Sequence, residues 1–115
     1  MIFNKITGTF NSTNGEDLIK YYAYTPLDEV KGIVQVSHGM CEYIERYEYL
    51  AEFFASQGIL LCGNDHLGHG NSVLSNNNLG YFAAENGWTY LYKDLYELTK
   101  IIKNKYPNVP YFLLG

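Results

Sequence analysis

The sequence predicts an α/β protein in which an antiparallel hairpin leads into a parallel sheet with helices on both faces. Three short apolar runs, at residues 33–36, 59–62 and 111–114, alternate with two longer segments whose apolar residues recur at helical spacing. Near-continuous apolar strands are typical of parallel sheets that are covered on both faces. The 115 residues are enough for one small domain with its own core.

The hairpin is predicted at the start of the chain. Residues 6–10 and 18–25 are rich in β-formers, and Asn14-Gly15 between them is a strong turn signal. Pro26 lacks a backbone N–H and is expected to end the second strand. We expect this hairpin to add two strands at one edge of the sheet.

Helical spacing marks the two longer segments. The apolar residues of the first are Tyr47, Leu50, Ala51 and Phe54. Gly58 follows them in the position expected of a C-terminal cap. A polar, glycine-rich loop is expected over residues 63–80. The apolar face of the second segment comprises Trp88, Leu91, Tyr92, Leu95, Leu98 and Ile102, and Pro107 and Pro110 close that segment.

Composition argues against several classes of protein. The net charge is −4 and no basic patch is present, so nucleic acid or an anionic membrane surface would lack its usual electrostatic attraction. The N-terminus lacks the apolar core of a signal peptide, and no apolar run is long enough for a transmembrane segment. Cys41 and Cys62 fit neither a metal site nor a disulfide framework. We therefore expect a soluble, cytoplasmic protein.

The last apolar run, residues 111–114, is predicted to be a third buried strand, and Gly115 alone follows it in this chain. A parallel sheet needs a return connection and a covering helix after such a strand, and a bare apolar edge favours aggregation. We expect residues 1–115 to be the N-terminal portion of a single, incomplete domain. Its partner would be the missing C-terminal part of the same domain.

Two polar segments, residues 37–42 and 64–72, follow predicted strands at the edge where open α/β sheets bind ligands. In the first segment, His38-Gly39 predicts a sharp turn with a backbone N–H free to point into the crevice. Such a donor suits the stabilisation of an oxyanion. A tight turn with a hydrogen-bonded His38 explains the same residues without catalysis.

The second polar segment contains Asp65, His66 and His69, which invite a metal-site interpretation. A metal would need a further converging donor, and His38 is the remaining histidine of the chain. A loop braced by hydrogen bonds, with glycines at positive φ, is the simpler interpretation, so we expect no metal.

No residue has the surroundings of an activated nucleophile. Ser72 lacks the second glycine of a nucleophile elbow, and no acid–histidine arrangement follows Cys41. Glu42 and Arg46 are four residues apart, and we expect them to pair at the start of a helix, which is a structural role.

Three segments, taken together, resemble a known family. Residues 36–42 with Arg46-Tyr47 resemble a His-Gly-x-x-Glu segment with a downstream Arg-Tyr. Residues 64–72 resemble an Asp-His-x-Gly-His-Gly-x-Ser loop, and residues 106–115 resemble the approach to a Gly-x-Ser-x-Gly elbow. In this order and spacing they resemble the serine hydrolases that include monoacylglycerol lipases, lysophospholipases and related esterases, some labelled serine aminopeptidases.

The resemblance implies the α/β-hydrolase fold and cleavage of a carboxylic ester by a Ser-Asp-His triad, without a cofactor. It implies that Met40 supplies an oxyanion-hole N–H from its backbone and that His38 and Gly39 shape that turn. It also implies that Gly115 is the first glycine of the elbow, so that the nucleophile, acid, base and lid lie outside this chain. The residues implied to form the structural loop beside the site are Asp65, His66, Gly68, His69, Gly70 and Ser72.

The implied substrate is a small-molecule ester of lipid type, a monoacylglycerol or a lysophospholipid. A short ester or a peptide-like amide stays open because the lid and acyl pocket are missing. Tyr43 stands where many relatives carry a second histidine, so that histidine has no counterpart here. An alternative is a non-catalytic relative that binds an acyl ligand or a partner. We expect residues 1–115 alone to be inactive, since an oxyanion donor without its serine cannot form an acyl-enzyme.

Overall fold

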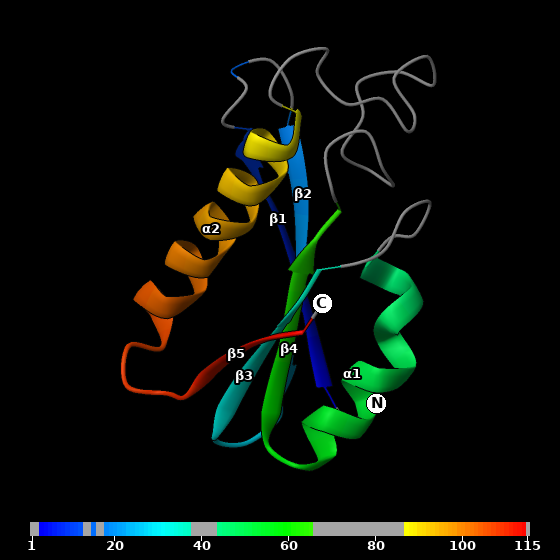
Figure 1. Cartoon of the computed structure of the whole chain (residues 1–115). Coiled ribbons are helices and arrows are strands. Elements are labelled where there is room, and N and C mark those ends of the chain that lie inside the picture. The colour runs from blue at the N-terminus through cyan, green and yellow to red at the C-terminus, as the bar shows by residue number, and fades with distance from the viewer. Residues whose placement is uncertain (1–2, 13–14, 16–17, 38–43, 66–86, 115) are drawn as a thin grey trace.

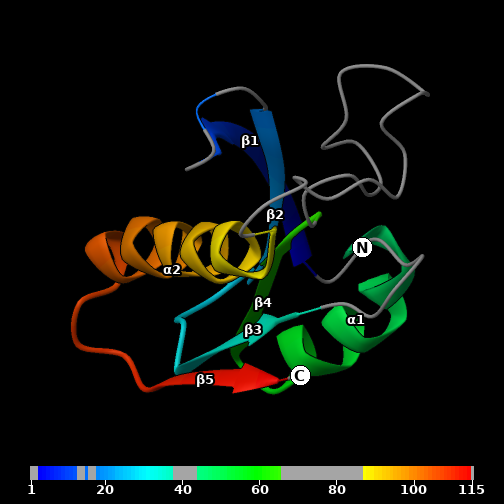
Figure 2. The same cartoon turned by 45° about the horizontal axis from the view of Figure 1, so that its top comes forward.

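The chain folds into one mixed sheet with a helix on each face (Figures 1 and 2). The computed structural model describes the chain except for residues 1–2, 13–14, 16–17, 38–43, 66–86 and 115, and the side chains of 87–92. Within these residues the elements are β1 (Phe3–Asn11), β2 (Leu18–Pro26), β3 (Gly32–Val36), the 3₁₀ turn η1 (Ile44–Tyr47), α1 (Glu48–Ser56), β4 (Ile59–Asn64), α2 (Gly87–Lys105) and β5 (Tyr111–Leu114).

The strand order in the sheet is β1-β2-β4-β3-β5. Strand β3 runs parallel to both β4 and β5, while β2 is antiparallel to both β1 and β4. The predicted hairpin therefore lies at one edge, and the predicted parallel strands form the rest of the sheet. Both predictions are confirmed.

The β1–β2 hairpin pairs over its whole length, from Phe3 opposite Pro26 to Asn11 opposite Leu18. In the turn, Gly15 has a φ of 81° and donates its N–H to the carbonyl of Ser12 at 3.0 Å. This left-handed conformation favours glycine because a Cβ would clash with the backbone. The asparagine of the predicted turn, Asn14, lies outside the described residues.

One face of the sheet is covered by η1 and α1. Its buried core consists of Tyr22, Tyr24, Val36, Ile44, Ala51 and Leu61. Helix α1 ends where the sequence predicts, because Gly58 has a φ of 79° and donates its N–H to the carbonyl of Ala55 at 3.0 Å. The small side chain of Ala51, which is fully buried, lets α1 approach the sheet closely.

Helix α2 covers the other face (Figure 2). The buried core there consists of Ala23, Ile33, Leu60, Cys62, Leu98 and Ile102. Of the apolar face predicted for this helix, Leu98 and Ile102 are buried and Leu95 is half-buried. The side chains of Trp88, Leu91 and Tyr92 lie outside the described residues.

A buried amide connects α2 to the strands beneath it. Gln35 on β3 is fully buried, and its Nε2 donates to the carbonyl of Leu95 at 3.0 Å. Its Oε1 accepts hydrogen bonds from the hydroxyl of Thr99, at 2.6 Å, and from the hydroxyl of Tyr111. Both the nitrogen and the oxygen of this buried amide thus have hydrogen-bond partners, as burial requires.

Two sequence predictions about the strands are wrong. The loop expected from residue 63 begins later, because Gly63 and Asn64 belong to β4 and pair with β2. The run at 111–114 is not buried: Phe112 and Leu113 are 63% and 64% exposed. The reason is position, since within the described residues β5 is the edge strand with β3 on one side only.

Candidate functional site

The two predicted site segments leave the sheet from neighbouring parallel strands. Ser37 follows β3 and Asp65 follows β4, and Val36, the last residue of β3, lies opposite Gly63, the last but one of β4. The N–H of Ser37 donates to the carbonyl of Leu114 at 2.9 Å, so β5 ends at the same edge. This edge is where open α/β sheets carry their sites.

Of the predicted site residues, the structure describes Asp65. The others, whose placement remains a prediction, are His38, Gly39, Met40, His66, Gly68, His69, Gly70, Ser72 and Gly115. The pairing expected between Glu42 and Arg46 stays a prediction, because Glu42 lies outside the described residues. What the structure does show is how the two segments are anchored where they meet the sheet.

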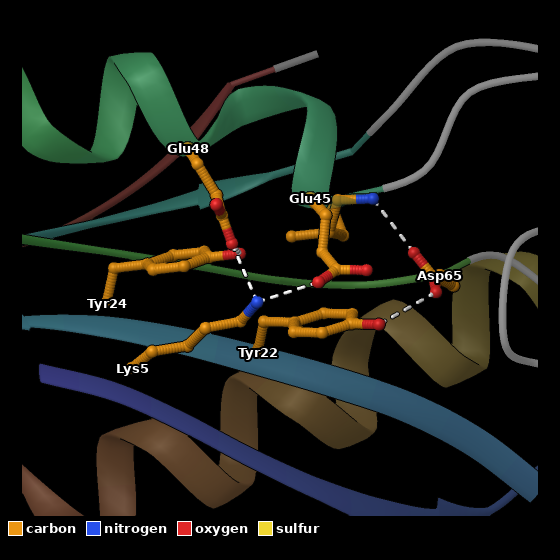
Figure 3. Close-up of polar contacts among 7 residues, drawn as sticks. Lys5, Tyr22, Tyr24, Glu45, Glu48 and Asp65 are labelled. Atoms are coloured by element: carbon orange, nitrogen blue, oxygen red, sulfur yellow. Dashed lines mark hydrogen bonds and ion pairs between the residues drawn. The ribbon is translucent and has the colours of Figure 1, made fainter.

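Asp65 is buried, with 1% of its surface exposed, and forms three hydrogen bonds to η1 and β2; Figure 3 shows the two that its carboxylate accepts. Its Oδ1 accepts the backbone N–H of Ile44 at 2.8 Å, and its Oδ2 accepts the hydroxyl of Tyr22 at a longer 3.5 Å. Its own N–H donates to the carbonyl of Lys20 at 2.9 Å. Ile44 lies two residues after the first site segment, residues 37–42, and Asp65 belongs to the second, so one hydrogen bond joins the fold near the end of the first segment to the start of the second.

A glycine in β4 allows this approach. A Cβ placed on Gly63 would lie 2.5 Å from Cδ1 of Ile44 and 2.9 Å from the carbonyl oxygen of Val36. Ile44 is fully buried against this strand. A side chain at position 63 would therefore push η1 away from the sheet. The sequence signal is a glycine at the end of an apolar run, a pattern that also predicts the start of a loop.

An ion-pair cluster beside this contact was not predicted. The Nζ of Lys5 on β1 lies 2.7 Å from Oε2 of Glu45 and 2.7 Å from Oε2 of Glu48 (Figure 3). The hydroxyl of Tyr24 donates to the same Glu48 oxygen at 3.0 Å. No local sequence pattern could have revealed it, because Lys5 and Glu45 are forty residues apart.

The pKa values of the groups in this cluster are shifted, mainly because the groups contact one another or are buried. Hydrogen bonds to Glu45 and Glu48 raise the pKa of the Lys5 ammonium above its ordinary value. The same contact with Lys5 holds the pKa of Glu48 below its ordinary value. Burial, with a smaller contribution from the Glu48 carboxylate, raises the pKa of the Tyr24 phenol. At neutral pH these shifts keep Lys5 a cation, Glu48 an anion and Tyr24 a neutral donor.

A cavity of about 450 Å³ lies at the other end of the sheet and does not belong to this site. It is lined by the end of β2, including Pro26, and by Lys31 and Gly58, which precede β3 and β4. Ligand sites of this fold class lie beyond the carboxyl ends of parallel strands, and this cavity lies at their amino ends.

Neither helix within the described residues has the length and hydropathy to cross a membrane.

Comparison with known proteins identifies the relatives of this chain. The family described as "Serine aminopeptidase, S33" matches residues 28–115. A monoglyceride lipase homolog of monkeypox virus is 38% identical over 106 residues, which are 92% of this chain and 36% of the relative. The monoglyceride lipase of Rattus norvegicus is 31% identical over 104 residues, which are 90% of this chain and 32% of the relative. The chain thus spans about a third of the length of these relatives.

Solved structures share the fold. A thermostable carboxyl esterase from Bacillus coagulans, in complex with glycerol, superposes with a TM-score of 0.84 and 34% identity over 100% of this chain and 36% of that one. An open-form lipase superposes with a TM-score of 0.87 over 96% of this chain and 35% of that one, at 24% identity. The architecture described above is therefore that of α/β-hydrolases, as predicted.

Proposed function

Because this chain belongs to the serine aminopeptidase S33 family of α/β-hydrolases, we propose that the protein hydrolyses carboxylic esters of lipid type. A monoacylglycerol or a lysophospholipid is the proposed substrate. The observation that carries the proposal is the hydrogen bond from Ile44 to Asp65, because it ties the two motif segments together at the carboxyl edge of the sheet. The monoglyceride lipases among the relatives support the choice of a lipid ester.

The proposed chemistry proceeds through an acyl-enzyme. A serine two residues after Gly115 attacks the ester carbonyl, and a histidine paired with an aspartate takes its proton. The backbone N–H of Met40, in a turn shaped by His38 and Gly39, donates to the oxyanion of the tetrahedral intermediate. Collapse expels the alcohol, which takes the proton from the histidine, and water then releases the fatty acid. The triad residues come from polypeptide outside residues 1–115.

The proposed reaction needs no cofactor, because backbone and side-chain groups alone carry it out. We also propose that the protein is cytoplasmic. A reducing compartment agrees with Cys62, a free thiol among the described residues. Burial raises the pKa of this thiol to about 12, so it stays protonated at neutral pH. Cys62 is thus a core residue and takes no part in the proposed reaction.

The test treats the protein, at its full encoded length, with a fluorophosphonate probe that labels activated serines. We expect one label, on the serine of the elbow, and turnover of monoacylglycerol or lysophosphatidylcholine. A p-nitrophenyl ester and an aminoacyl amide serve as the competing substrates. Residues 1–115 alone are the matched control, and we expect neither label nor turnover from them.

Each outcome separates two functions. A protein that neither reacts with the probe nor cleaves any ester contradicts the proposal. If that inert protein still binds monoacylglycerol, the function is that of a non-catalytic acyl-binding relative. Preferential turnover of the amide would retain the acyl-enzyme mechanism and replace the substrate class.

A further inference from the structure

Lys5 connects the N-terminal hairpin to the element that carries Ile44. It lies on β1, yet its ammonium contacts Glu45 in η1 and Glu48 in α1. The three side chains are only 33%, 39% and 40% exposed. Partial shielding makes such pairs stronger than those on an open surface.

Aromatic rings complete the surroundings of the ammonium. The Nζ of Lys5 lies 5.5 Å from the ring centroid of Tyr22 and 5.9 Å from that of Tyr24. Both distances lie within the range of a cation–π attraction. The two rings and two carboxylates together determine where the ammonium sits, and the ammonium in turn determines where the carboxylates sit.

The contacts form a closed circuit that includes the candidate site (Figure 3). Lys5 lies against the ring of Tyr22, whose hydroxyl donates to Asp65. Asp65 accepts the N–H of Ile44, and the next residue, Glu45, returns to Lys5. Each contact is weak alone, but a circuit restrains every member from two directions.

We propose that Lys5 is a positioning residue for η1 and for the hydrogen bond that Ile44 donates to Asp65. It holds η1, through Glu45 and Glu48, where the N–H of Ile44 meets Asp65. Ile44, which lies two residues after the segment 37–42, is thereby held beside Asp65. The inference rests on the proposed function, in which that segment supplies the oxyanion donor.

Removal of the Lys5 ammonium is expected to displace η1. Glu45 and Glu48 are three residues apart and converge on one cation, so without Lys5 two like charges face each other. Their repulsion favours a displaced η1, and Ile44 then leaves Asp65 more often. In Lys5→Met the apolar stem is retained, so the change removes the charge and little packing.

The experiment measures two quantities in the protein at its full encoded length. Amide hydrogen exchange at Ile44 reports how often the hydrogen bond to Asp65 opens. The values of kcat and KM for ester hydrolysis report how well the site binds and converts its substrate. For Lys5→Met we expect exchange at Ile44 to be about fivefold faster, the scale of a partly shielded ion-pair cluster. We expect kcat to fall about threefold or more with KM unchanged, because an oxyanion donor acts in the transition state.

Two further variants serve as controls. Lys5→Arg keeps the charge and should restore both quantities. Lys100→Met removes an exposed ion pair on α2, where Nζ lies 2.8 Å from Oε1 of Glu97 and 5.3 Å from the ring of Tyr96. It should leave Ile44 exchange and kcat unchanged. Should Lys5→Met fail to fold, Glu45→Gln breaks one arm of the cluster and should accelerate Ile44 exchange about twofold.

The outcomes decide the inference independently of the proposed function. Ile44 exchange in Lys5→Met equal to that of Lys100→Met overturns it. Faster exchange with an unchanged kcat also overturns it, because the position of η1 would then not matter to the site. A wild-type protein without esterase activity contradicts the proposed function, while the exchange rates still decide whether Lys5 holds Ile44.

Discussion

The carboxylate of Asp65 accepts the backbone N–H of Ile44 at 2.8 Å, and both residues are almost completely buried. The contact spans twenty-one residues of sequence and joins the end of β4 to the start of η1. A buried N–H needs a partner, and here a charged side chain is that partner. The predictions below follow from this contact and from the residues packed around it.

Asp65→Ala should destabilise the fold by roughly 2–3 kcal/mol, because it leaves the buried N–H of Ile44 and the hydroxyl of Tyr22 without this acceptor. Asp65→Asn keeps a carbonyl oxygen for Ile44 and should cost about half as much. Urea denaturation measures both differences. Equal losses in the two variants would mean that the charge of Asp65, rather than its acceptor, stabilises the contact.

Gly63→Ala should destabilise the protein by about 1–3 kcal/mol, because the new Cβ overlaps Cδ1 of Ile44 and the carbonyl oxygen of Val36. Ile44→Val removes the overlapping Cδ1. We expect the double variant to lose less stability than the sum of the two single losses, which a double-mutant cycle measures. Simple additivity would show that η1 moves aside without cost.

The Lys5 cluster should make stability depend on pH at both ends of the scale. The lowered pKa of Glu48 means that its contribution is present above the ordinary value of 4.5 and is lost as pH falls through the lowered value. The raised pKa of Lys5 means that its contribution is complete below 10.5 and is lost as pH rises through the raised value.

The measurement is thermal unfolding of wild type and Lys5→Met across this range. Because the side chains are about a third exposed, solvent screening limits the difference near neutral pH to roughly 1 kcal/mol. The unfolding temperatures of the two proteins should converge in strong acid and again as pH rises through the raised pKa of Lys5, which lies above 10.5. A constant difference at every pH would assign the effect to packing instead of charge.

Gln35→Leu should cost about 2–3 kcal/mol, because the hydroxyl of Tyr111 loses its acceptor on β3 and the carbonyl of Leu95 loses a donor. Tyr111→Phe removes one donor and should cost about 1 kcal/mol. Guanidinium denaturation of the two variants provides the comparison. If Gln35→Leu is neutral, apolar packing under α2 compensates for the lost hydrogen bonds.

Much of the fold follows from patterns that are local in the sequence. The hairpin, the end of α1 before Gly58, and the buried faces around Leu98 and Ile102 depend on residues within a few positions of each other. Turn residues, caps and helical spacing act over that distance, so a single sequence reveals them. The family motifs likewise are contiguous, and the resemblance they carry is confirmed for residues 28–115.

Other features depend on which strands become neighbours, and only the tertiary structure decided them. The order β1-β2-β4-β3-β5 brings Lys5 to Glu45, brings Asp65 to Ile44, and leaves Phe112 exposed on the edge strand. These contacts arise between segments twenty to forty residues apart, where periodicity and propensity carry no information. The sequence by itself determined the elements and the family, whereas strand order determined which charges meet, because attraction between side chains begins only when the backbone brings them within a few ångströms.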